Sequence, residues 1–223
     1  MSKIIFHSGR EYNSYITDFH PKPSAKVVPR WYLDADKHDK NPETGEYLFY
    51  NGNKMPSFKS CPALLDFFTS GYVFVTPCDL FFYKENDKIL IKKPKGYEDF
   101  CDSRPTMPDF VVPKGYYQTP FHWYPVWAPE LPEGYSAIYL SPVNHFDLPF
   151  ITVSGIIDND KFNTPGLMPF FLKEEFTGLI PAGTPFVQII PFKRENWESE
   201  IKLYDQEKII ERFMKSGETF RKP

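Results

Sequence analysis

The chain has 223 residues, enough to bury a full hydrophobic core as one domain, with or without extensions. Its hydrophobic content of 41% excludes wholesale disorder, and its net charge of −3 argues against a dedicated nucleic-acid binder, which would carry a basic excess. The 23 prolines and the 18% of aromatic residues favour short strands with rigid connections over a helix bundle, so we expect a mostly β protein.

The first 60 residues are predicted to form an extension that packs on the core. A first strand is expected at residues 3–7. Residues 27–32 indicate an extended segment with an aromatic anchor formed by Trp31 and Tyr32. Residues 34–45 are rich in Asp, Lys, Asn and Pro, which is typical of a solvated surface loop.

A β domain is predicted for residues 61–195. Residues 61–68 have the pattern of a short helix with Pro62 in its first turn. Three strands are predicted next, of which the second and third pair across a turn: 71–75, 80–83 and 89–91. Residues 92–113 contain four prolines and are expected to form a loop.

The three cysteines are Cys61, Cys78 and Cys101, and none forms a Cys-x-x-Cys pair. This spacing argues against a zinc site and against a disulfide framework, so we expect reduced thiols and no bound metal. The first seven residues are too short for a signal sequence, and no apolar run approaches the length of a membrane span. These features predict a soluble cytoplasmic protein, in a host cell or inside a particle, with no membrane contact.

Residues 120–127 form the most aromatic window of the chain. They either fill the core between sheet layers or line a recognition surface, and the core is favoured because aromatic side chains bury large areas. Further strands are predicted at the β-branched and aromatic runs that follow: 138–140, 150–153 and 186–192. Lys193 and Arg194 come directly after the last run and either contact an anion or remain solvated.

The last segment, residues 196–223, changes character. Ile209, Ile210, Phe213 and Met214 recur at helical spacing and predict an amphipathic helix over residues 205–215. Such a helix would dock on its own domain or on a neighbouring subunit.

Three motifs occur in order within residues 131–192: a Pro-x-Gly-Tyr strand start, a Gly-x-Ile-Asp-x-Asp element, and a closing strand that begins Pro-x-Gly. They stand at Pro132–Tyr135, Gly155–Asp160 and Pro181–Gln188. This arrangement resembles the superfamily of deoxyuridine triphosphatases (dUTPases) and deoxycytidine triphosphate deaminases. The resemblance implies a β-clip fold, a compact barrel of short strands, here with an N-terminal extension and a C-terminal helix. It also implies a homo-oligomer, because members often form trimers with sites at subunit boundaries.

The same resemblance implies roles for particular residues. Asp158, with Asp160 nearby, would hold a sugar hydroxyl and orient a water molecule as general base. Phe162 would replace the tyrosine that stacks on the deoxyribose. Mg²⁺ would be the cofactor only if a nucleotide binds. The remaining candidate ligand contacts lie around the two strands on either side of this element: Asn144, His145 and Gln188.

The departures from the superfamily bear on activity. Where members have an Arg-Ser element that grips phosphates, this chain has Ser141-Pro142-Val143-Asn144, so a bidentate cation is lost. The Gly-rich, Arg-containing C-terminal arm that closes over the nucleotide is also absent from the sequence. The alternative for Asp158-Asn159-Asp160 is a structural turn held by bonds from side chain to backbone.

His145-Phe146-Asp147 forms a His-x-Asp element, and His122 is the only histidine of the aromatic window. An iron site with two histidines and one carboxylate normally has its second histidine after the His-x-Asp element. No histidine follows His145 here, and His122 precedes it. A loop histidine beside an aspartate partner is the favoured interpretation.

Most of the chain also resembles an uncharacterised family of bacteria and tailed phages, through Cys61–Asp66 and Phe121–Trp123 as well as the three motifs. Two functions follow as hypotheses. The first is a non-catalytic binding or assembly protein, phage-encoded as a virion component or host-interaction factor, whose partners are proteins or copies of itself. The alternative is a divergent nucleotide pyrophosphatase or deaminase-like enzyme that uses Asp158 with a new anion grip.

Overall fold

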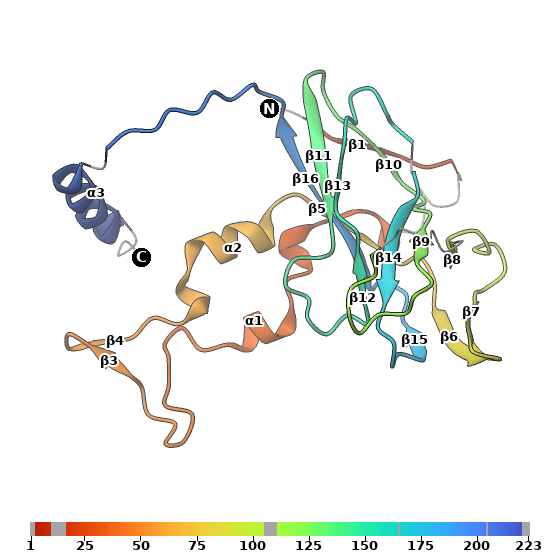
Figure 1. The fold of residues 1–223 in the computed structure, drawn as a ribbon, viewed down its shortest axis with the longest axis horizontal. Coiled ribbons are helices and arrows are strands. Elements are labelled where there is room, and N and C mark those ends of the chain that lie inside the picture. Colours follow the sequence, from red (N-terminus) through yellow and green to blue (C-terminus); the bar gives the residue numbers. More distant parts are fainter. Residues whose placement is uncertain (1–2, 10–16, 105–110, 165, 204, 220–223) are drawn as a thin grey trace.

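The structure, a computed structural model, describes residues 3–9, 17–104, 111–164, 166–203 and 205–219, and it is mostly β. The largest sheet is antiparallel with the strand order β13-β11-β16-β5-β2. Its strands are β13 (Gly155–Ile157), β11 (Tyr135–Leu140), β16 (Pro185–Lys193), β5 (Tyr72–Val75) and β2 (Lys22–Pro23). β13 and β16, which carry the acidic and closing motifs, therefore lie in one sheet on either side of β11 (Figure 1).

A second sheet has the order β12-β14-β9-β8 and packs near the first. Its strands are β12 (Phe150–Thr152), β14 (Met168–Leu172), β9 (Phe121–Trp123) and β8 (Cys101–Ser103). A third sheet has the order β15-β6-β7, formed by β15 (Gly178–Ile180), β6 (Leu80–Glu85) and β7 (Lys88–Lys92). Two pairs complete the strands, β1 (Ile5–His7) with β10 (Ala128–Glu130), and β3 (Phe49–Tyr50) with β4 (Asn53–Lys54).

The helical elements are short apart from α2 and α3. The α-helices are α1 (Arg30–Asp34), α2 (Pro62–Thr69) and α3 (Gln206–Thr219). Three 3₁₀ turns are described: η2 (Thr17–Phe19), η3 (Ser24–Lys26) and η4 (Phe58–Ser60). Pro62 stands at the start of α2, where its missing N–H costs no helical hydrogen bond, which confirms the predicted helix start.

The core is built from the aromatic window. Phe121 and Trp123 are fully buried, and the Trp123 ring stacks on Phe170 with centroids 3.9 Å apart. The Trp123 indole donates to Thr152 Oγ1 at 3.1 Å, and that hydroxyl donates to the Phe186 carbonyl oxygen at 2.6 Å, so the buried polar atoms are paired. The prediction that this window fills the core is confirmed, although Tyr124 within it is exposed.

The hairpin between β6 and β7 also matches its prediction. Asn86 and Asp87 both have positive φ, +48° and +60°, as a tight two-residue turn requires. The turn residues therefore identified the pairing of these two strands correctly.

Two sequence interpretations are wrong, and one strand was not predicted. Residues 27–32 are not wholly extended, because the helix α1 begins at Arg30 directly after Pro29 and buries Tyr32 against Phe68. The predicted loop at 92–113 contains the strand β8, which pairs with β9 in the second sheet. β14 was missed because Pro169 interrupts its sequence. In the structure Pro169 lies opposite His122, and its carbonyl oxygen accepts from Val153 N.

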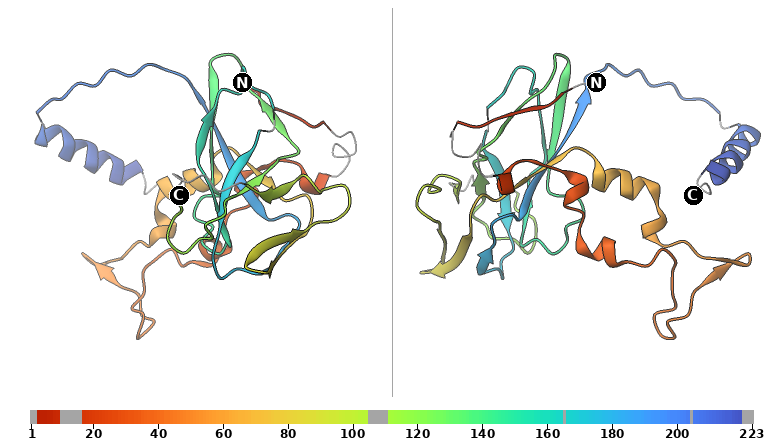
Figure 2. Two further views of the ribbon diagram at one scale, coloured as in Figure 1. Left: turned by 45° about the vertical axis from the view of Figure 1, so that its right-hand side comes forward. Right: turned by 180° about the vertical axis from the view of Figure 1, so that it is seen from behind.

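The first 60 residues do more than pack on the core, because β1 pairs with β10 and β2 extends the five-stranded sheet. Residues 36–58, which include β3 and β4, project away from the sheets (Figures 1 and 2). Residues 195–203 also leave the sheets as an extended segment, and α3 stands apart from the sheets (Figures 1 and 2). The predicted C-terminal helix is confirmed, while the side chains of Phe213 and Met214 lie outside the description. None of the described helices is long and apolar enough to cross a membrane.

Gly71, just before β5, provides a test of the packing between β5 and β16. Its φ is +72°, and a β-carbon there would lie 1.9 Å from the carbonyl oxygen of Ile189. We predict that Gly71→Ala lowers the free energy of unfolding by about 3 kcal/mol, from the left-handed backbone and the overlap together. Gly52→Ala is the matched control, since Gly52 has φ +77° with open space around it. If urea unfolding shows the same decrease in the free energy of unfolding for both variants, the close packing of Gly71 against Ile189 is contradicted.

Candidate functional site

Asp158, Asn159 and Asp160 form a turn directly after β13. The carbonyl oxygen of Asp158 accepts from Lys161 N at 2.9 Å and from Phe162 N at 2.8 Å. The buried Asn159 side chain accepts from the Tyr139 hydroxyl at 3.1 Å and donates to the Phe162 carbonyl oxygen at 3.1 Å. Asn159 thus fixes the turn to the core.

Arg194, the first residue after β16, brings its guanidinium to both carboxylates. Its Nη1 lies 3.1 Å from Asp158 Oδ1 and 2.8 Å from Asp160 Oδ1, and its Nη2 donates to Asp160 Oδ2. Asp160 therefore receives a two-pronged contact, the strongest geometry for an Arg–carboxylate pair. The sequence left Arg194 as either an anion contact or a solvated residue, and the structure pairs it with this chain's own carboxylates.

The start of β11 supplies the remaining partners. Gly134 N donates to Asp160 Oδ2 at 2.9 Å, and the Ser136 hydroxyl donates to Asp158 Oδ1 at 2.6 Å. Arg194 Nη1 also donates to the Tyr135 carbonyl oxygen at 3.1 Å, and Arg194 N donates to the Gly134 carbonyl oxygen at 2.8 Å. We call Ser136, Asp158, Asp160 and Arg194 the acid–arginine cluster. It joins the ends of β13 and β16 to the start of β11.

The cluster keeps both acids ionised. Hydrogen bonding by Arg194 holds the pKa of Asp160 far below its usual value, and the Gly134 amide lowers it further. The Ser136 hydroxyl is the main cause that lowers the pKa of Asp158, and the Arg194 charge adds to it. The Asp160 side chain is only 3% exposed, whereas Asp158 is half-exposed. Neither carboxylate suits a general base, which needs a pKa close to the working pH.

Three other candidate residues, Asn144, His145 and Gln188, lie at the opposite end of β11. Gln188 pairs with Leu140, and its buried side chain donates to the carbonyl oxygens of Phe67 at 3.2 Å and Ser70 at 2.9 Å. Its Oε1 accepts from Val143 N at 3.1 Å. With all three bonds made inside the chain, Gln188 joins α2 to the loop after β11 and offers little to a ligand.

Asn144 and His145 lie in that loop and line a surface cavity of about 470 Å³. Asn144 has φ +54°, and its carbonyl oxygen accepts from the Trp31 indole at 2.8 Å. Burial lowers the pKa of His145, while the Val27 backbone and the charge of Asp147 oppose this shift. Asp147 thus acts on this loop histidine through its charge, and no hydrogen bond or ion pair between the two side chains is found among the described residues.

The six candidate residues thus form two groups and no single site. Tyr135 begins β11 beside the acid–arginine cluster, and Leu140 ends it beside Gln188. At about 3.3 Å per residue these strand ends are about 16 Å apart. Phe162 lies at the cluster end, where its ring is exposed. The described residues contain no group of three His, Cys, Asp or Glu side chains that could share a metal ion, so His122, His145 and Asp147 do not form one.

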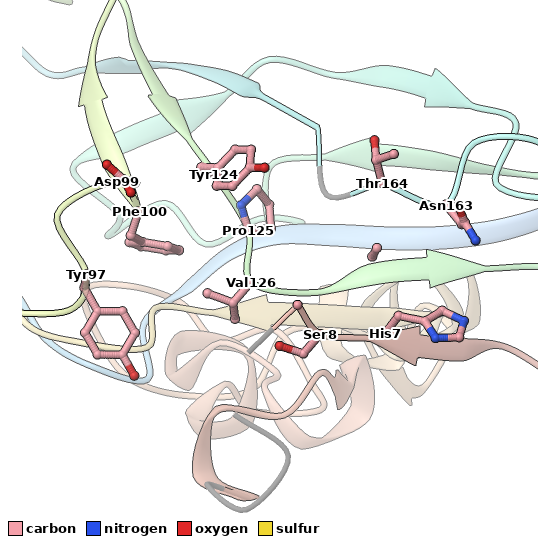
Figure 3. Close-up of a pocket in the computed structure, with 12 residues that line it drawn as sticks. His7, Ser8, Tyr97, Asp99, Phe100, Tyr124, Pro125, Val126, Asn163 and Thr164 are labelled. Carbon is pink, nitrogen blue, oxygen red and sulfur yellow. The ribbon is translucent and has the colours of Figure 1, made fainter. Parts of the chain in front are cut away.

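A cavity of about 420 Å³ lies beside the β1–β10 pair, at residues that the sequence did not name as site candidates, apart from residues 124–126 of the aromatic window. Figure 3 shows Tyr97, Asp99 and Phe100 at one end of it, Tyr124 and Val126 in the middle, and His7, Asn163 and Thr164 at the other end. Three different loops and the end of β1 meet there. Their separation in the sequence left no local motif that could have revealed the cavity.

No family model, curated protein or solved structure matches this chain.

The acid–arginine cluster gives a pH-dependent contribution to stability. Its aspartates have folded pKa values below the unfolded value, so their contribution is present above about pH 4 and is lost as the pH falls further. We predict that Asp160→Asn lowers the melting temperature by several degrees at pH 7 and that the gap to the wild type narrows towards pH 3.

Asp34→Asn is the matched control for thermal denaturation across this pH range. It breaks the exposed Arg30–Asp34 pair within α1, and exposed pairs contribute little. If the difference in melting temperature between Asp160→Asn and the wild type stays constant from pH 7 to pH 3, the cluster is not the source of the pH dependence.

Proposed function

We propose that the chain is a non-catalytic assembly protein that binds a second copy of itself through its C-terminal arm, residues 195–203. The observation that carries the proposal is the exposed apolar surface of this arm. Trp197, Ile201 and Leu203 are 86%, 99% and 100% exposed. Burying one aliphatic side chain of this size contributes about 2 kcal/mol, so the arm gains considerably from a binding surface.

The arm has the pattern of a strand that lacks a partner. Trp197, Ser199, Ile201 and Leu203 alternate with Glu198, Glu200 and Lys202, which places apolar and charged side chains on opposite faces of an extended chain. In the described part of the chain, no backbone hydrogen bond connects residues 195–203 to another segment. An extended segment of this kind commonly binds by lying along a sheet of another chain.

A suitable receiving surface exists on the outer face of the β15-β6-β7 sheet. Leu179 and Phe81 are exposed neighbours across β15 and β6, and the Phe81 ring stacks on Tyr83. Lys88 and Lys92 are exposed at the two ends of β7, whose outer edge pairs with no described strand. The arm carries three glutamates against one lysine over residues 195–203. Its charge complements this basic rim, which is why we choose a second copy as its partner.

The acid–arginine cluster supports a non-catalytic role. Arg194 directs its donors at two carboxylates and a carbonyl oxygen of this chain, so it stabilises the sheet ends.

We also propose the β-clip arrangement of the dUTPase superfamily. It is supported by the three motifs, which fall at the start of β11, at the end of β13 and into β16, within one sheet. If the chain is phage-encoded, as the sequence resemblance implies, the assembly would be that of a virion component or host-interaction factor.

One observation favours the alternative, a nucleotide-hydrolysing enzyme. An arginine from elsewhere in the chain does lie beside Asp158, although Ser141–Asn144, which replace the superfamily's Arg-Ser element, lie at the other end of β11. In that case Arg194 would have to exchange Asp160 for a phosphate. Asp160 is nearly enclosed and bonded through both oxygens, which makes this exchange costly.

The assembly role is tested by light scattering coupled to size-exclusion chromatography. The wild type is expected to have a mass above that of the monomer, rising with concentration. The double variant Ile201→Asp/Leu203→Asp is expected to be monomeric with an unchanged melting temperature, because these side chains make no contact within the subunit. Val111→Asp, a change at an exposed valine outside the arm, is the matched control and should leave the mass as in the wild type.

Charge reversal identifies the receiving surface. Glu198→Lys/Glu200→Lys should weaken the association, and adding Lys88→Glu/Lys92→Glu should restore it. A wild type that stays monomeric at all concentrations contradicts the proposal. Association that survives the Ile201→Asp/Leu203→Asp change contradicts the role of the arm.

A further inference from the structure

The cavity beside the β1–β10 pair has the construction of a small-molecule site. Its volume of about 420 Å³ lies within the usual range for ligand pockets. Its lining is mostly apolar, with Phe100 buried beneath it and Val126 half-buried against the core. Polar side chains stand mainly at its two ends (Figure 3).

The charge of the lining is negative. Asp99 lines one end, and its carboxylate has no hydrogen-bond or ion-pair partner among the described residues. The only other ionisable side chain of the lining besides the tyrosines is His7, whose Nε2 lies 2.6 Å from Glu130 Oε2. Among the described residues no lysine or arginine lines the cavity, and His7 is already bonded to Glu130, so an anionic ligand would meet the Asp99 carboxylate with no free cation among these residues.

Aromatic rings line the same end of the cavity as Asp99. Tyr97 and Phe100 lie at the Asp99 end, and Tyr124 lies next to them along the cavity (Figure 3). Aromatic faces attract cations, and a carboxylate beside them adds an ion pair. The opposite end offers the Asn163 amide and the Thr164 hydroxyl, whose side chains bond to no other described residue. These neutral groups suit a hydroxyl or amide of the ligand.

We propose that this cavity binds a small arylalkylamine. The ammonium group of the ligand pairs with Asp99 beside the tyrosine rings. Its aromatic body lies on Phe100 and Val126, and a hydroxyl at its far end bonds to Asn163 or Thr164. This site is independent of the arm and of the acid–arginine cluster, because it shares no residue with either.

Three phenols of nearly equal size test the inference: tyramine, which is a cation, tyrosol, which is neutral, and 4-hydroxyphenylacetate, which is an anion. Binding is followed by chemical-shift titration of the backbone amides of the full chain. Tyramine is expected to bind about fivefold more tightly than tyrosol, the preference of an exposed cation site. The anion is expected to bind most weakly, and the shifts should centre on residues 97–100 and 124–126.

Asp99→Asn should remove the preference for tyramine over tyrosol while leaving tyrosol binding unchanged. Asp102→Asn is the matched control, because Asp102 is an exposed acid three positions away that does not line the cavity, and it should keep the preference. Equal binding of the three phenols, a preference that survives Asp99→Asn, or shifts centred elsewhere would overturn the inference. None of these outcomes depends on whether the arm associates.

Discussion

The guanidinium of Arg194 joins three strand ends. It reaches from the end of β16 to the two aspartates after β13 and to the Tyr135 carbonyl oxygen at the start of β11. Charges taken out of water are costly unless they are paired and hydrogen-bonded, and here both the arginine and Asp160 have several partners. The pair can therefore remain in place with Asp160 almost fully enclosed. Because β11 and β16 contribute Tyr139 and Phe186 to the core, the cluster fixes the ends of strands that carry core side chains.

The same contact decides how the acidic motif is understood. From the sequence alone, Asp158-Asn159-Asp160 was either a catalytic element or a structural turn. The structure gives each of its three side chains a partner within the chain: Ser136 and Arg194 for Asp158, Tyr139 for Asn159, and Gly134 with Arg194 for Asp160. An acid that is held ionised by such partners is a poor proton acceptor. The arrangement favours a stabilising role for the motif.

Much of the fold could be predicted because local sequence specifies it. The β6–β7 hairpin follows from its Asn-Asp turn, α2 from Pro62 at its start, and β16 from its apolar run. The contact between Arg194 and the aspartates could not be predicted, because it depends on the register that places Lys193 opposite Tyr135. Register is a tertiary property, and a shift of one residue would turn Arg194 to the other face. The cavity beside β1 was missed for the same reason, since four separate segments form it.

Arg194 belongs to the acidic pair and is not free to grip a phosphate. Thermal denaturation with a panel of nucleoside and deoxynucleoside triphosphates and Mg²⁺ tests it most directly, because a ligand that binds the native state raises its melting temperature. The account predicts no shift with any nucleotide. A saturable rise with one nucleotide that disappears in Asp158→Ala would contradict it and would favour the enzyme.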